Sequence, residues 1–305
     1  MTTKNIFMVG FLFFMLLSCA EKNNKAEKTT PSTSIKSSMD MDSDSSMDMD
    51  SRYKNAETKR VIEKMIAAHR GLEKWKSKPS FSYTNTYIHP SDPSDPWTSD
   101  EIVENGRRRV FQNWPLDKAQ VIYDGKGYYG VNWIRGNPPK FTAHLAFYFS
   151  NLPWVTQDPG VMLGEVRKKK ILNEPKEYLA VKMTFGSGTG ESSDDYYNLL
   201  IDPETYTLRG IEYIMAYGAI LDAFELPKDV KFLGSFIKKM VDYETVDGLK
   251  MVTKLITFGP KGEDYGYHTY KNWNFSKTFE DKLVTVPSNA IEDTSSSKMK
   301  RIIKK

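Results

Sequence analysis

The chain has 305 residues, of which 39% are hydrophobic and 27% are charged, a composition typical of a folded globular protein. Its formal net charge is +4, but without the tail at 298–305 the basic residues number 38 against 39 acidic ones. The body of the chain is therefore nearly neutral, which argues against a nucleic-acid-binding surface. A single cysteine excludes a disulfide scaffold, and the one long apolar run, at the N-terminus, excludes a multi-span membrane protein.

The N-terminus has the pattern of a secretion signal. Lys4 precedes an apolar stretch at 6–17, which is short for a membrane span, and the sequence Leu-Leu-Ser-Cys at 16–19 ends it. This end resembles the lipobox of bacterial lipoproteins, in which the cysteine is acylated and becomes the first residue. We predict a lipoprotein signal peptide at 1–18 and a lipid anchor on Cys19, against the alternative of an ordinary secretory signal. Ala20 after the cysteine favours the outer membrane, with the leaflet left open.

A polar segment follows the predicted anchor. Residues 19–54 contain few branched apolar or aromatic residues, so we predict a disordered tether between lipid and domain. Within it Ser-Ser-Met-Asp-Met-Asp occurs twice, at 37–42 and 45–50. The repeat admits two interpretations: a weak site for a soft cation such as Cu(I), or simply a solvated acidic tract. The candidate thioether ligands are Met39, Met41, Met47 and Met49.

The body of the chain begins with a predicted helix. Asn55 suits an N-cap, and apolar residues then recur at helical spacing as far as Trp75. His69 lies on the apolar side of this pattern, where a buried histidine with satisfied hydrogen bonds is a simpler interpretation than a metal ligand. Pro79 ends the helix.

From residue 81 the pattern changes to short strands joined by turns. Asn105-Gly106 and the turn at 124–127 predict two hairpins, and 90–97 is rich in Pro, Asp and Ser, as in a loop. The block at 141–154 interrupts the strands with helical spacing, which predicts a short aromatic lid helix with Phe149 and Leu152 turned inward. The predicted strands are 81–88, 101–104, 107–111, 119–123, 128–133, 164–172, 177–185, 196–201, 208–217, 239–245, 250–258 and 265–275.

Together these elements predict a mainly β fold of the α+β type. Neighbouring hairpins give an antiparallel meander, and a sheet of about ten to twelve strands tends to curl into an incomplete barrel. The expected half-barrel domain spans 55–293, followed by a basic disordered tail at 294–305.

The order of several short motifs resembles an uncharacterised family, a domain of unknown function found in Gram-negative lipoproteins, which is similar to the Lol-type (LolA/LolB-like) lipoprotein-sorting fold. The resemblance implies an incomplete antiparallel β-barrel with a helical lid over about 59–291, and it supplies no catalytic residues. The motifs are Ala68–Trp75, Tyr123–Lys126, Ala146–Pro153, Gly186–Ser192, Ile201–Tyr206 and Val246–Leu249.

Function is harder to predict than fold. The sequence contains no nucleophile elbow, P-loop or His-Glu-x-x-His motif, so we assign no catalytic residue and expect no cofactor. Aromatic residues make up 13% of the chain, which suits a concave apolar site. The expected function is a membrane-anchored protein that holds a lipid or other hydrophobic ligand, with a packed structural or protein-interaction lipoprotein and, third, a hydrolase as alternatives. The candidate lining residues are Tyr87, Trp133, Phe147, Phe149, Phe185 and Tyr213.

Overall fold

The computed structural model describes residues 51–135, 137–186, 196–215, 218–223, 230 and 232–295. Within them the strands form one antiparallel sheet with the order β13-β5-β4-β3-β2-β1-β12-β11-β10-β9-β8-β7-β6. The strands are β1 Ser80–His89, β2 Asp92–Glu104, β3 Val110–Trp114, β4 Ala119–Tyr123, β5 Tyr128–Val131, β6 Val161–Lys170, β7 Glu177–Phe185, β8 Tyr196–Ile201, β9 Leu208–Met215, β10 Leu233–Val246, β11 Leu249–Phe258, β12 Asp264–Asn274 and β13 Ile291–Glu292.

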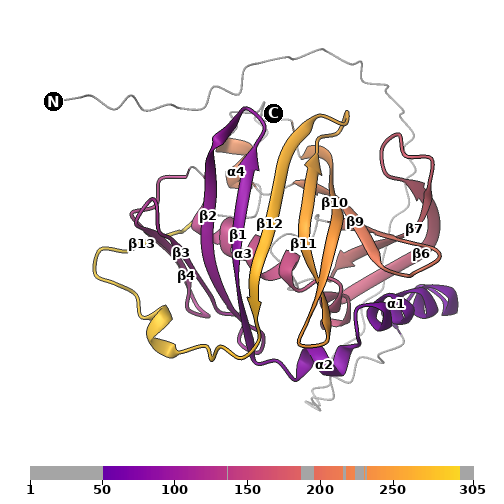
Figure 1. Ribbon diagram of the computed structural model, residues 1–305, viewed down its shortest axis with the longest axis horizontal. Helices are drawn as coiled ribbons and strands as arrows, with labels where there is room; N and C mark the ends of the chain where they lie inside the picture. Colours follow the sequence, from indigo (N-terminus) through magenta and orange to yellow (C-terminus); the bar gives the residue numbers. More distant parts are fainter. Residues whose placement is uncertain are drawn as a thin grey trace, which may run out of the picture. The chain divides into compact units, whose positions relative to one another are not determined.

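The sheet curls around one helix without closing. Helix α3 (Pro139–Ser150) contacts β2, β3, β4 and β5, and its ring Phe149 also meets Tyr213 of β9 on the far half of the sheet. Figure 1 shows α3 behind β1, β12 and β11, on the concave side. The edge strands β13 and β6 are not paired with each other. The predicted mainly β fold, an incomplete antiparallel barrel with an N-terminal helix and an aromatic lid helix, is confirmed.

Residues on the two faces of the sheet form separate apolar clusters. The main core fills the concave side and includes α1 (Ala56–Ala68), α2 (Leu72–Lys76) and α3. Two smaller clusters lie on the convex side, one around Ile102 and Phe279 and one around Ile171 and Ile237. Phe149 is 7% exposed within the main core and Leu152 packs against it, so both point inward as expected. Among the described helices, none has the length and apolar character needed to cross a membrane.

The predicted N-terminal helix is broken near its end. Arg70 and Gly71 have φ angles of 77° and 92°, and the chain resumes as the five-residue helix α2. Glycine adopts a positive φ angle without strain, so the presence of Gly71 explains why the helix breaks at this position. The consequence is that His69, the C-cap of α1, and Trp75 of α2 are both buried. The Asn55 side chain caps α1 by accepting a hydrogen bond from Thr58 N, as predicted.

Some boundaries differ from the prediction. The segment predicted as a loop at 90–97 is wrong from Asp92 onward, because β2 begins there and continues the ladder with β1 as far as the pair His89 and Asp92. Pairing with β1 along the whole length of β2 outweighs the loop preference of these Pro and Asp residues. Helix α4 (Gly218–Ala223), the short helices η1 (Trp154–Gln157) and η2 (Asp281–Val284), and strand β13 were not predicted.

The folded region also starts earlier than residue 55. Lys54 N donates to Leu163 O at 2.9 Å, and Leu163 N donates to Arg52 O at 2.8 Å. These bonds join 52–54 to β6, so the predicted tether is wrong for its last residues. Cys19, the signal peptide at 1–18, Met39, Met41, Met47, Met49 and most of the tail lie outside the described residues.

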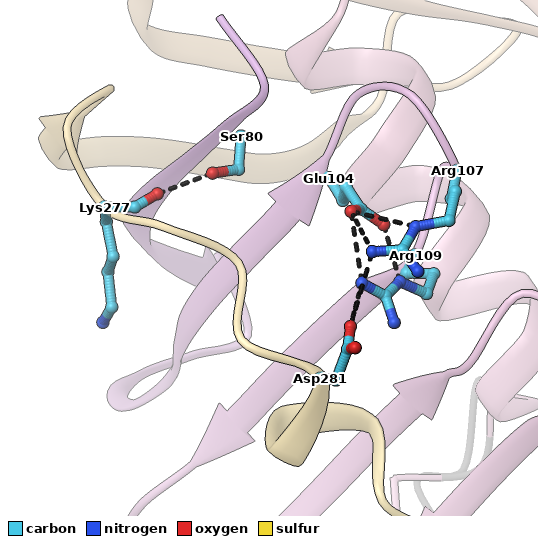
Figure 2. Close-up of polar contacts among 6 residues, drawn as sticks. All are labelled: Ser80, Glu104, Arg107, Arg109, Lys277 and Asp281. Atoms are coloured by element: carbon cyan, nitrogen blue, oxygen red, sulfur yellow. Dashed lines mark hydrogen bonds and ion pairs between the residues drawn. The ribbon is translucent and has the colours of Figure 1, made fainter.

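The C-terminal segment is fastened across the convex face. The Arg109 Nε donates to Glu104 Oε2 at 2.6 Å, and its guanidinium also pairs with Asp281 at 2.8 Å (Figure 2). The same guanidinium lies 4.7 Å from the centroid of the Phe279 ring. Ser80 Oγ donates to Lys277 O at 2.6 Å on the same segment. These contacts hold Phe279 over the Ile102 cluster and lead the chain to β13.

Candidate functional site

Six aromatic rings form a continuous surface on the concave face at one end of the half-barrel. Neighbouring rings in the set have centroids 5.8–6.3 Å apart. They come from α3 and from β7, β8, β9 and β10, because side chains on the same face of paired strands lie side by side. We call this set the aromatic wall; its members are Tyr148, Phe149, Phe185, Tyr197, Tyr213 and Phe236.

The aromatic wall is deep in the protein but incompletely covered. Burial raises the pKa of Tyr213 and lowers that of His268, on the nearby β12, so both side chains are remote from bulk water. Nevertheless Tyr213, His268 and Phe185 are only half-buried. This end of the concave face therefore keeps some aromatic surface accessible.

Tyr87 stands beside this surface. Its ring centroid is 4.7 Å from that of His268, and its hydroxyl donates to Tyr265 O at 2.6 Å. Burial raises the pKa of Tyr87 to about 12, with smaller effects from Asp264 and Tyr265, so the hydroxyl stays protonated and acts as a donor. Because the hydroxyl proton is held by Tyr265 O, the oxygen of Tyr87 can act only as an acceptor for another group.

A buried carboxyl group on β2 is hydrogen-bonded to side chains of β1 and β2. Glu101 is 1% exposed and accepts hydrogen bonds from Tyr83 at 2.6 Å, Ser99 at 2.7 Å and Asn85 at 3.1 Å. Because Asn85 donates to Glu101, its amide oxygen faces His268 and accepts from Nδ1 at 3.0 Å. Burial raises the pKa of Glu101, while these donors oppose that shift. The network satisfies the polar groups and leaves His268 Nε2 as the acceptor nitrogen.

The opposite end of the concave face is packed. Trp75 and Trp154 stack with centroids 4.2 Å apart and planes inclined by 4°, and both are nearly fully buried. His69 lies at its edge, 1% exposed, with Nδ1 donating to Lys250 O and Nε2 accepting from Leu208 N, both at 3.2 Å. This confirms a satisfied buried histidine. Burial lowers the pKa of His69 to about 4, so the imidazole is neutral.

A groove of about 420 Å³ lies outside this packed end. Its walls come from α2, the β2–β3 turn and the region from α3 to η1. Arg108 pairs with Asp158 at 2.8 Å and lies 5.1 Å from the Phe147 ring centroid, which closes the inner side of the groove. The groove combines an aromatic floor with basic residues at its rim, and none of the six wall residues lines it.

The structure gathers some of the predicted lining residues and separates others. Phe149, Phe185 and Tyr213 belong to the aromatic wall, and Tyr87 adjoins it. Phe147 faces the groove instead, because it lies on a different side of α3. Trp133 packs on Trp114 at 5.3 Å and donates to Asn137 O, in the connection between β5 and α3. Phe147 nevertheless touches the wall at its edge, since its ring centroid is 5.5 Å from that of Tyr148.

Sequence reasoning missed Lys238, Glu101 and His268, three polar side chains at the same interior surface. The alternation Phe236, Lys238, Met240 could have signalled an inward lysine, but we placed the start of that predicted strand at residue 239. No group of three or more His, Cys, Asp or Glu side chains in the described part of the chain has the arrangement of a metal site.

Comparison with known proteins gives a match to one family. Residues 140–268 match a family of unknown function, DUF6503. The expected resemblance to a domain of unknown function is thereby confirmed from α3 to the first five residues of β12. No curated protein matches the chain.

Among solved structures, the chain is similar to a LolA superfamily protein from Nitrosomonas europaea, with 10% identity and a TM-score of 0.47 over 75% of this chain and 97% of that one. It is also similar to a DUF1329 family protein from Desulfovibrio piger, with 10% identity and a TM-score of 0.45 over 74% and 96% of the two chains.

Proposed function

We propose that this protein is a lipid-anchored protein of the bacterial cell envelope that binds a lipid or another hydrophobic molecule against the aromatic wall. The observation that carries the proposal is the run of neighbouring aromatic rings on the concave face, in which Phe185, Tyr197 and Tyr213 keep part of their surface accessible. Apolar concave surface of this kind is the usual form of a small-molecule site. The proposal assigns the protein a binding role and no reaction.

Native mass spectrometry tests this proposal. The full chain carrying Cys19→Ala, purified without detergent, should retain a hydrophobic ligand or take up an added one such as oleate at about one molecule per chain. The matched control is Tyr213→Trp, which fills the space with a larger ring and should reduce uptake. The alternative of a packed structural or protein-interaction lipoprotein expects no bound molecule in either protein, and that outcome would reject the ligand-binding function.

The anchor is a separate part of the proposal. Cys19→Ala should remove acylation and release the protein from membranes into the soluble fraction, because two or more acyl chains are what make such anchoring stable. Fractionation of cells that produce each form, followed by carbonate extraction of the membranes, measures this. Membrane association of the variant that resists carbonate would contradict a lipid anchor at Cys19 and leave the ligand proposal unaffected.

A further inference from the structure

Lys238 is a buried amine on the concave face. It lies on β10, paired in register with Ile211 of β9 and Thr257 of β11, and it is 6% exposed. Its Nζ donates to Thr257 Oγ1 at 3.1 Å and lies 4.9 Å from the centroid of the Phe149 ring. The side chain therefore points at the aromatic wall from the strand that also carries Phe236.

The other lysines nearby have carboxylate partners. Lys239, the next residue along β10, pairs with Glu174, and Lys169 of β6 pairs with Glu212. In the described part of the chain, Lys238 has no carboxylate partner. An ammonium group has three hydrogen-bond donors, so one hydroxyl leaves two of them unused. Burial of a charged group without a counter-ion also carries a large desolvation penalty. Lys239 and Lys169 thus have carboxylate partners, whereas Lys238 donates to a single hydroxyl among the described residues.

The surroundings of Lys238 favour an anion. Burial lowers its pKa to about 8, so the ammonium form still predominates at neutral pH. Burial, with the charge on Lys238, holds the pKa of His268 well below its usual range, so that imidazole is neutral. One positive charge therefore stands at the base of an apolar ring surface. An amphipathic molecule with a single anionic group would complement both features at once.

We propose that Lys238 binds the anionic headgroup of an amphipathic ligand, whose apolar chain lies along Tyr213 and the rest of the aromatic wall. This inference rests on the proposed ligand-binding function and specifies its ligand class. The headgroup chemistry is a carboxylate or a phosphate monoester, either of which accepts charge-assisted hydrogen bonds from an ammonium group. Thr257 Oγ1, which accepts from Lys238, has a hydroxyl proton available to the same anion.

The test compares anionic and neutral probes of equal chain length. Oleate, oleoyl lysophosphatidate and oleyl alcohol are titrated against the full chain carrying Cys19→Ala, and dissociation constants are measured by displacement of a fluorescent probe. A charge-assisted hydrogen bond gives about a tenfold or larger preference, so at least one anion should bind about tenfold more tightly than the alcohol. Comparison of oleate with lysophosphatidate distinguishes the two headgroups.

Lys238→Met should abolish this preference while it leaves the affinity for oleyl alcohol within about twofold, since Met keeps the apolar volume and removes the charge. Lys238→Gln serves as a second neutral variant if Met alters folding. Lys239→Met, on the opposite face, is the matched control and should keep the preference. Equal binding of acid and alcohol by the unsubstituted site, or an unchanged preference in both Lys238 variants, would overturn the inference. Failure of all three probes to bind would instead reject the proposed function itself.

Discussion

Replacing Trp154 with Ala should lower the free energy of unfolding by about 3–5 kcal/mol, the range for large buried aromatic residues. The ring is 2% exposed, stacks on Trp75 and donates from Nε1 to Gly71 O at 3.1 Å. The substitution would open a cavity where η1 meets the break between α1 and α2. Equilibrium unfolding in urea, followed by tryptophan fluorescence and circular dichroism together, measures the change.

Leu116→Ala provides the control because that side chain is 74% exposed, and it should change stability by less than about 0.5 kcal/mol. A loss below about 1 kcal/mol for Trp154→Ala would show that the packed end of the concave face is not where the domain is stabilised. The location proposed for the ligand depends on the contrast between this packed end and the aromatic wall, and that contrast would be lost.

Acid should destabilise the domain through His69. Its pKa is about 4 in the folded protein against 6.5 in the unfolded chain, so below pH 6.5 only the unfolded chain takes up the proton. The free energy of unfolding should therefore fall as the pH drops from about 6.5 to about 4, by about 3 kcal/mol from this residue, and level off below. Burial is the main cause of the lowered pKa of His69, and the positive charge of the nearby Lys250 lowers it further.

His69→Gln isolates this effect. The Gln amide can donate to Lys250 O and accept from Leu208 N but does not titrate. Glu101 acts in the opposite direction, since its raised pKa makes the folded protein bind its proton more readily, and this contribution is common to both proteins. The difference in stability between the wild type and the variant should therefore shrink or reverse as the pH falls from 7 to 4. A difference that is constant over this range would contradict a neutral buried His69.

The elements that sequence predicts well are those whose local signals agree with the sheet. Asp247-Gly248 joins β10 to β11 directly, with φ angles of 47° and 73°, and fixes the register there. Asn105-Gly106 marks the β2–β3 connection, but that connection runs over 105–109 and β3 begins at Val110, so the strand predicted at 107–111 starts three residues too early. The strand over 92–97 could not be predicted in the same way. Its Pro and Asp residues indicate a loop, and only the long partner β1 makes them part of a ladder. Strand β13 is two residues long and exists because the C-terminal segment is carried across the convex face to β5.

The site was predicted only in outline. An aromatic content suited to a concave surface is visible in the sequence, but which rings meet depends on the face of α3 and on the curl of the sheet. Phe147 and Phe149 are two residues apart, and this separation sends one to the groove and the other to the wall. The amine of Lys238 reaches the wall only because β10 begins at Leu233, several residues before the predicted strand.

Photolabelling with a fatty acid that carries a diazirine in its chain tests the location of the ligand most directly. The full chain with Cys19→Ala is irradiated with the probe, digested and mapped by mass spectrometry, with excess oleate as competitor. The proposed function expects competed labels on peptides of β1, β7 and β9 that contain Tyr87, Phe185 and Tyr213. Labels confined to the convex face or to the groove at Phe147, or labels that oleate does not reduce, would contradict a ligand site at the aromatic wall.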